Sequence, residues 1–94
     1  MRLKPGASLE GAKPELLAGL NRLDALWERH GLRLVVTAGK DGKHMVGSKH
    51  YEGLAADLRF PLRDEIKAAL GQDWDVVWEK DHVHVEFDPK PTNR

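Results

Sequence analysis

Hydrophobic side chains recur at steps of three and four residues between positions 14 and 30, which is the spacing of one face of an α-helix. Pro14 suits the first position of a helix, and Gly31 suits the residue that ends one. The pattern therefore predicts an amphipathic helix between these two residues. Its apolar positions are Leu16, Leu17, Leu20, Leu23, Leu26 and Trp27.

The rest of the chain shows shorter patterns, which predict strands and a second helix. The predicted strands cover residues 32–37, 55–60, 75–79 and 82–87, and the second helix covers 61–70. A tight turn at Lys80 and Asp81 is expected to join the last two strands, and a glycine-rich loop covers 38–53. This order favours an α+β fold in which a small antiparallel sheet packs against two helices.

The length of 94 residues predicts a single domain over 1–94, with an irregular lead-in at 1–13 and a flexible tail at 88–94. Fifteen basic residues balance fifteen acidic ones, so the formal net charge is zero. A neutral chain argues against a dedicated nucleic-acid binder and against a polybasic membrane anchor. No apolar run approaches the roughly 18 residues of a membrane-spanning helix.

The chain contains no cysteine, which excludes disulfides and thiolate metal sites. Any metal must therefore be held by His, Asp or Glu. The last predicted strand offers such residues, because His82, His84 and Glu86 alternate with apolar residues and share one face. Taken alone, the two histidines are either plain surface residues or metal ligands.

A second set of candidate residues lies between the long loop and the second predicted strand. His50 ends the loop, Asp57 follows seven residues later, and Gly53 between them permits a sharp backbone turn. The residues alone leave the role of Asp57 open, because a surface carboxylate paired with Arg59 or Lys49 would give the same pattern. Two further loop residues, Ser48 and Tyr51, fit either a structural or a functional role.

The spacing Ser-x-His-x-x-Gly-x-Ala-x-Asp, from Ser48 to Asp57, resembles the signature of the zinc D-alanyl-D-alanine carboxypeptidases. The same group includes the phage L-alanyl-D-glutamate endolysins and, more distantly, the hedgehog signalling domain. A second signature of the group is an acidic residue three positions before a ligand His on a strand, and Asp81-His82-Val83-His84 is similar to it. The two segments stand in the order of the family, and the resemblance covers roughly residues 32–87. It implies a hedgehog/DD-peptidase-like fold.

The resemblance also implies roles for individual residues. His50, Asp57 and His84 would bind Zn²⁺ and leave a fourth position open, as in catalytic zinc sites. Asp81 would be the catalytic general base, and His82 would stabilise the developing oxyanion.

Other residues near these signatures have expected roles as well. Glu79 is a second candidate for the base, and Glu86 is expected to hold an imidazole in place. Ser48, Tyr51 and Lys40 are expected to contact the substrate. Members of the family usually carry an Arg just beyond the first strand, where residues 37–41 contain none. Lys40 or Lys43 is the candidate substitute, although a flexible ammonium is not equivalent to a bidentate guanidinium.

The implied function is that of a zinc metallopeptidase that hydrolyses an amide bond in the stem peptides of bacterial peptidoglycan. Both a carboxypeptidase and an endolysin-type endopeptidase fit the pattern. The alternative is a non-catalytic zinc-binding module of the same fold that binds cell-wall peptide or a protein partner. Because no apolar stretch follows the basic residues at the start, no signal peptide is visible. We therefore expect synthesis in the cytoplasm and action at the cell wall.

Overall fold

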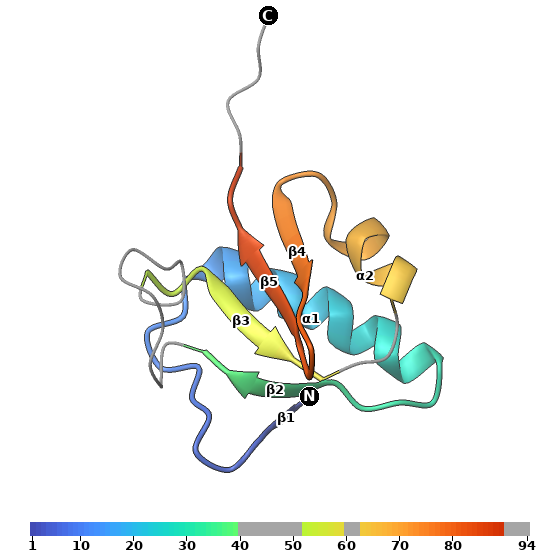
Figure 1. Ribbon diagram of the computed structural model, residues 1–94, viewed down its shortest axis with the longest axis horizontal. Coiled ribbons are helices and arrows are strands. Elements are labelled where there is room, and N and C mark those ends of the chain that lie inside the picture. The colour runs from blue at the N-terminus through green and yellow to red at the C-terminus, as the bar shows by residue number, and fades with distance from the viewer. Residues whose placement is uncertain (40–51, 60–62, 90–94) are drawn as a thin grey trace, which may run out of the picture.

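The computed structural model describes residues 1–39, 52–59 and 63–89. Within them the chain forms a five-stranded sheet and two helices (Figure 1). In chain order the elements are β1 (Arg2–Leu3), α1 (Pro14–Arg29), β2 (Val35–Ala38), β3 (Ala55–Leu58), α2 (Arg63–Leu70), β4 (Trp74–Trp78) and β5 (Val83–Phe87). The α+β fold class predicted from the sequence is confirmed.

The strand order in the sheet is β1-β2-β3-β5-β4, which places β3 at the centre. The pairs β2–β3, β3–β5 and β5–β4 are antiparallel, whereas β1 runs parallel to β2. The sheet is therefore mixed, although the sequence predicts an antiparallel one. The difference arises in the lead-in, where the amides of Arg2 and Lys4 donate to the carbonyl oxygens of Leu34 and Val36 at 2.8 and 2.9 Å.

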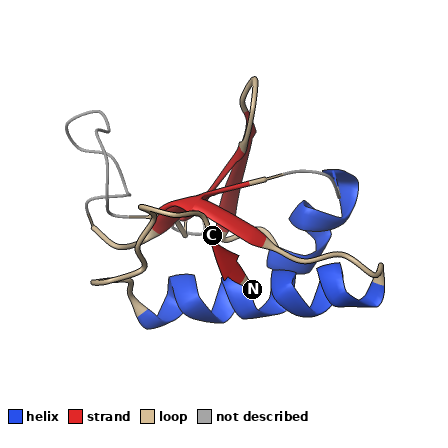
Figure 2. Cartoon of the chain, turned by 90° about the horizontal axis from the view of Figure 1, so that it is seen from below, coloured by secondary structure: helices blue, strands red, loops and turns tan. Residues whose placement is uncertain are grey.

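One face of the sheet packs against the helices, and α1 runs along it (Figure 2). The apolar positions predicted on the first helix supply much of this core, except that Leu17 is exposed. The strands contribute Val36, Ala56, Leu58, Val83 and Val85, all with no exposed surface. The remaining large core residues are Leu34, Ile66, Leu70 and Trp74. No helix among the described residues is long and apolar enough to cross a membrane.

The opposite face of the central strands carries the polar residues. On β5, the buried Val83 and Val85 alternate with the half-buried His84 and Glu86, as the sequence predicts. On β3, Asp57 stands between two buried core residues and so points away from the helices. The sheet therefore separates an apolar core from a polar surface that spans its two middle strands.

The hairpin between β4 and β5 turns at Lys80 and Asp81, as expected. The amide of Glu79 donates to the carbonyl oxygen of His82 at 3.0 Å, and the last paired residues before the turn are Trp78 and Val83. Asp81 and His82 are thereby held at one end of the polar face.

Helix α1 passes so close to β4 that a side chain at Gly19 would meet the Trp74 ring. We expect Gly19→Ala to destabilise the fold by about 1–3 kcal/mol, because the rigid indole is buried and cannot move aside. Thermal unfolding should show a Tm lower by about 4–8 °C for each kcal/mol. The matched control is Asn21→Ala on the exposed side of α1, where alanine favours the helix. Equal melting temperatures for wild type and Gly19→Ala would contradict this packing.

Candidate metal and catalytic site

The polar face brings Asp57 and His84 together. They are cross-strand partners in the register of β3 and β5, and His84 Nδ1 donates to Asp57 Oδ1 at 3.1 Å. Both side chains are largely buried, with exposed fractions of 14% for Asp57 and 17% for His84. The pairing of the strands therefore holds two of the three predicted zinc ligands in contact.

The spacing of these two atoms suits a shared zinc ion. Ligand atoms about 2.1 Å from a tetrahedral zinc ion lie about 3.3–3.4 Å from one another. The separation of 3.1 Å between His84 Nδ1 and Asp57 Oδ1 needs only a small adjustment to reach that value. A neutral imidazole nitrogen and a carboxylate oxygen are also donors that zinc accepts.

The second nitrogen of His84 contacts another carboxylate. His84 Nε2 donates to Glu86 Oε1 at 2.8 Å, so the ring is held from both sides. The hydrogen bond to Asp57 is the main cause that raises the pKa of His84, the bond to Glu86 adds to it, and burial opposes both. Glu86 is thus placed to orient the imidazole ring of His84, and the sequence predicts that it holds an imidazole in place.

His82 links the hairpin turn to this pair. His82 Nδ1 donates to Asp81 Oδ1 at 2.7 Å, and His82 Nε2 lies 3.8 Å from Asp57 Oδ1. Five side chains therefore follow one another across the polar face. We call them the carboxylate–histidine row, which consists of Asp81, His82, Asp57, His84 and Glu86.

Asp81 is the most exposed member of the row, with 86% of its side chain accessible. The hydrogen bond from His82 lowers the pKa of Asp81 further below neutral pH, where an aspartate is ionised in any case. Glu79, the other candidate base, is exposed, and its carboxylate forms no hydrogen bond or ion pair within the described residues. The geometry brings Asp81 into the row and leaves Glu79 outside it.

Four of the predicted site residues lie outside the described residues. They are Lys40, Ser48, His50 and Tyr51. Gly53, from the same motif, is described and has the positive φ of 75° that the predicted turn requires. A side chain there would also meet the carbonyl oxygen of Gly11.

The structure also reveals a group of carboxylates that the sequence did not indicate. Single oxygen atoms of Asp75, Glu86 and Asp88 all lie within 4.8 Å of one another, a donor set that could hold a cation. Asp75 and Glu86 meet because β4 and β5 pair in that register. Neighbours across a hairpin cannot be read from the sequence until its register is known.

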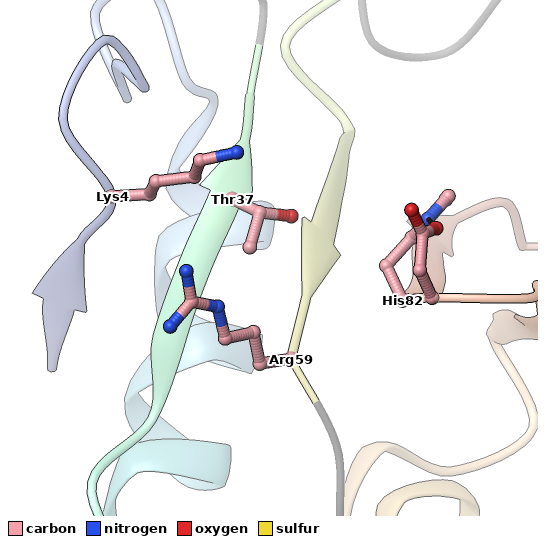
Figure 3. A pocket seen from close by; sticks show the side chains of 5 residues that line it. Lys4, Thr37, Arg59 and His82 are labelled. Carbon is pink, nitrogen blue, oxygen red and sulfur yellow. Dashed lines mark hydrogen bonds and ion pairs between the residues drawn. The ribbon is translucent and has the colours of Figure 1, made fainter.

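A pocket of about 400 Å³ opens beside the hairpin end of the row (Figure 3). Asp81 and His82 line it together with Lys4, Thr37 and Arg59. Of these, Lys4 and Thr37 were not predicted as site residues, and Arg59 was considered only as an ion-pair partner of Asp57. Thr37 lies in β2, and Lys4 and Arg59 directly follow β1 and β3, so these residues meet at one pocket only because the three strands pair in the sheet.

The contact between Glu86 and His84 leads to a test of metal affinity. We expect Glu86→Gln to weaken zinc binding by about 10- to 100-fold, because a ligand imidazole loses the carboxylate that orients it. Competition with a chromogenic chelator would measure the affinity. The control Asp75→Asn removes a charge from the same carboxylate group, and in the strand register Asp75 lies opposite Glu86, whereas Val77 lies opposite His84. An equal loss of affinity in both variants would mean that Glu86 acts only through its charge.

Comparison with known proteins finds a partial similarity. Over 64 residues the chain is 38% identical to the Tiggy-winkle hedgehog protein of Danio rerio. The match covers 57% of this chain and 15% of the hedgehog protein, so the chain corresponds to a small part of that relative. No family model matches the chain, and no solved structure matches it. The similarity is therefore to a protein of the hedgehog group, one of the groups that the sequence pattern resembles, and it does not single out the peptidases.

Proposed function

We propose that the chain is a zinc-dependent peptidase that hydrolyses an amide bond in bacterial cell-wall peptides. The observation that carries this proposal is the carboxylate–histidine row. On one face of the sheet it brings two predicted zinc ligands, Asp57 and His84, next to a candidate acid–base pair. A site that only held a metal would not need the pair Asp81 and His82 beside its ligands.

The residues that would hold zinc are Asp57 and His84, together with His50 from the first motif. A zinc ion with three protein ligands supplies Lewis-acid chemistry that activates water and polarises an amide carbonyl near neutral pH. Glu86 would fix the ring of His84 so that Nδ1 stays directed at Asp57.

The neighbouring side chains would move the protons. Asp81 is ionised, so it can accept a proton during attack on the amide and return it to the leaving amine. His82 donates to Asp81 through Nδ1, which leaves Nε2 facing the centre of the row. With a proton on Nε2 as well, the ring can donate a hydrogen bond to negative charge that develops on the amide oxygen.

The second candidate is a non-catalytic zinc-binding module of the same fold. One observation favours it: the region where the peptidases usually carry an Arg, residues 37–41, contains none in this sequence. In that case the zinc ligands would remain, and the surface would bind cell-wall peptide or a protein partner without cleaving it.

Digestion of purified sacculi by the zinc-loaded chain distinguishes these two functions. Mass spectrometry of the released fragments would identify the bond and separate carboxypeptidase from endopeptidase cleavage. We expect defined peptide fragments from the wild type and none from Asp57→Ala. A zinc-loaded wild type that binds sacculi and releases no fragment would support the non-catalytic module.

Metal content tests the assignment of the ligands. We expect about one zinc ion per chain, lost in His50→Ala, Asp57→Ala and His84→Ala. His82→Ala should retain it, because His82 Nδ1 is engaged by Asp81 and Nε2 lies 3.8 Å from Asp57. Elemental analysis of the purified variants measures this. Loss of zinc from His82→Ala, with zinc retained in His84→Ala, would reverse the assignment.

A further inference from the structure

Two basic side chains, those of Lys4 and Arg59, line the pocket at the hairpin end of the row without belonging to the row. Lys4 follows β1 and Arg59 follows β3, so they approach β2 from its two edges. The amide of Lys4 donates to the carbonyl oxygen of Val36 at 2.9 Å, and the amide of Arg59 donates to that of Val35 at 3.0 Å. Adjacent residues of β2 therefore anchor both backbones, although 55 positions of sequence separate Lys4 from Arg59.

The side chains of Lys4 and Arg59 extend toward β2, and the hydroxyl of Thr37 lies nearby (Figure 3). His82 and Asp81 line the same pocket from the hairpin turn. The pocket thus has a basic side formed by Lys4 and Arg59 and an acid–base side formed by Asp81 and His82. We call the two cationic side chains the basic pair.

The charges of the basic pair are available to a ligand. Within residues 1–39, 52–59 and 63–89, neither Lys4 nor Arg59 forms an ion pair, and both residues are exposed. The acidic group that shares the pocket, Asp81, is already hydrogen-bonded to His82. Two cations that face a pocket beside an engaged carboxylate favour an anionic ligand, and the planar guanidinium of Arg suits a carboxylate in particular.

We infer that Arg59, assisted by Lys4, binds a carboxylate of the peptide substrate and thereby positions the scissile amide at Asp81 and His82. This inference rests on the proposed function and names the feature of the substrate that the site recognises. Cell-wall peptides carry such a carboxylate in two places, at the C-terminus and on D-glutamate. In either place the negative charge would lie near the cleaved bond. The preference for it would come from Lys4 and Arg59, the residues that directly follow β1 and β3.

Peptide pairs that differ only in this charge provide the test. One pair is an acyl-D-alanyl-D-alanine peptide and its C-terminal amide, and the other is an L-alanyl-D-glutamyl peptide and its D-glutamine analogue. We expect the wild type to prefer the acid of at least one pair, and the preferred pair identifies which carboxylate is bound. In Arg59→Gln, kcat/KM for that acid should fall by about 10- to 100-fold, the usual effect of losing a charged hydrogen bond.

The amide of the same pair distinguishes binding from a structural effect. For the amide, kcat/KM should change little in Arg59→Gln, so the preference of the wild type disappears. Lys4→Gln should show a smaller loss in the same direction. Arg29→Gln is the matched control, because it removes the same charge at the exposed end of α1. Zinc content should be unchanged in all three variants.

Binding of the same peptides keeps this inference separate from the proposed function. Isothermal titration calorimetry compares the acid and the amide whether or not the chain cleaves them. If no peptide is cleaved and the wild type still binds the acid more tightly, with the difference lost in Arg59→Gln, the proposed peptidase fails and the carboxylate site stands. Equal binding and turnover of acid and amide by the wild type would overturn the carboxylate site. An equal loss for acid and amide in Arg59→Gln would do the same.

Discussion

Replacing Asp81 by Asn is expected to lower peptide turnover by about 100- to 10,000-fold, the usual effect of removing a general base. Asn has nearly the same size but cannot accept a proton at neutral pH. The hydrogen bond with His82 lowers the pKa of the Asp81 carboxylate and connects it to the row. Zinc should stay bound, because Asp57 and His84 contact each other independently of Asp81. Turnover of the peptide found by sacculus digestion, together with zinc analysis, measures both quantities.

Glu79→Gln is the matched control, since it makes the same chemical change two residues away in the same hairpin. Its carboxylate has no contact with the row among the described residues, so we expect a loss of less than about tenfold. An inactive Glu79→Gln beside an active Asp81→Asn would move the role of the base to Glu79.

The elements that the sequence predicts correctly are those with a repeated pattern. The alternation from His82 to Phe87 places the valines of β5 in the core and His84 on the polar face, as observed. The spacing of leucines similarly predicts α1 from Pro14. The strand β1 has only two residues, Arg2 and Leu3, and so leaves no period to detect. It forms because the edge of β2 offers hydrogen-bond partners to the lead-in.

The two sequence motifs predict which residues belong to the candidate site. They do not predict which of these residues touch, because that depends on the strand register and the turn geometry. The signatures place Asp57 and His84 among the residues of interest, and the register of β3 and β5 then makes them direct partners. The link from Asp81 through His82 to Asp57 depends on the geometry of the turn, which residue types alone do not specify. Lys4 and Arg59 carry no motif, and they face one pocket only because both flank β2.

Zinc removal is expected to lower the thermal stability of the chain. A ligand that binds only the folded state stabilises it by about 2.7 kcal/mol at a concentration 100 times its Kd. For a domain of this size that corresponds to a Tm higher by about 10–20 °C. Thermal unfolding followed by circular dichroism, with and without a chelator, measures the shift. Asp57→Ala is the control, because it should melt at the same temperature in both conditions.

The zinc-dependent rise in Tm should also grow with pH, and the contacts of His84 give the sign. Asp57 and Glu86 raise the pKa of His84 above its ordinary value of 6.5 in the folded chain without metal. The stability that this protonated ring contributes is complete below the pKa of the unfolded chain and is lost as the pH rises through the higher pKa of the folded state. Zinc needs the deprotonated nitrogen, so it competes with the proton at low pH and gains affinity over the same interval.

We therefore expect a larger zinc-dependent shift in Tm at about pH 8 than at about pH 6. In Glu86→Gln one of the two carboxylate contacts that raise the pKa of His84 is gone, so the increase should begin at lower pH than in the wild type. Melting curves of both proteins across this range, each with and without zinc, provide the measurement. An equal shift at both pH values would show that no proton is displaced when zinc binds. An increase that begins at the same pH in both proteins would assign the displaced proton to a group other than His84.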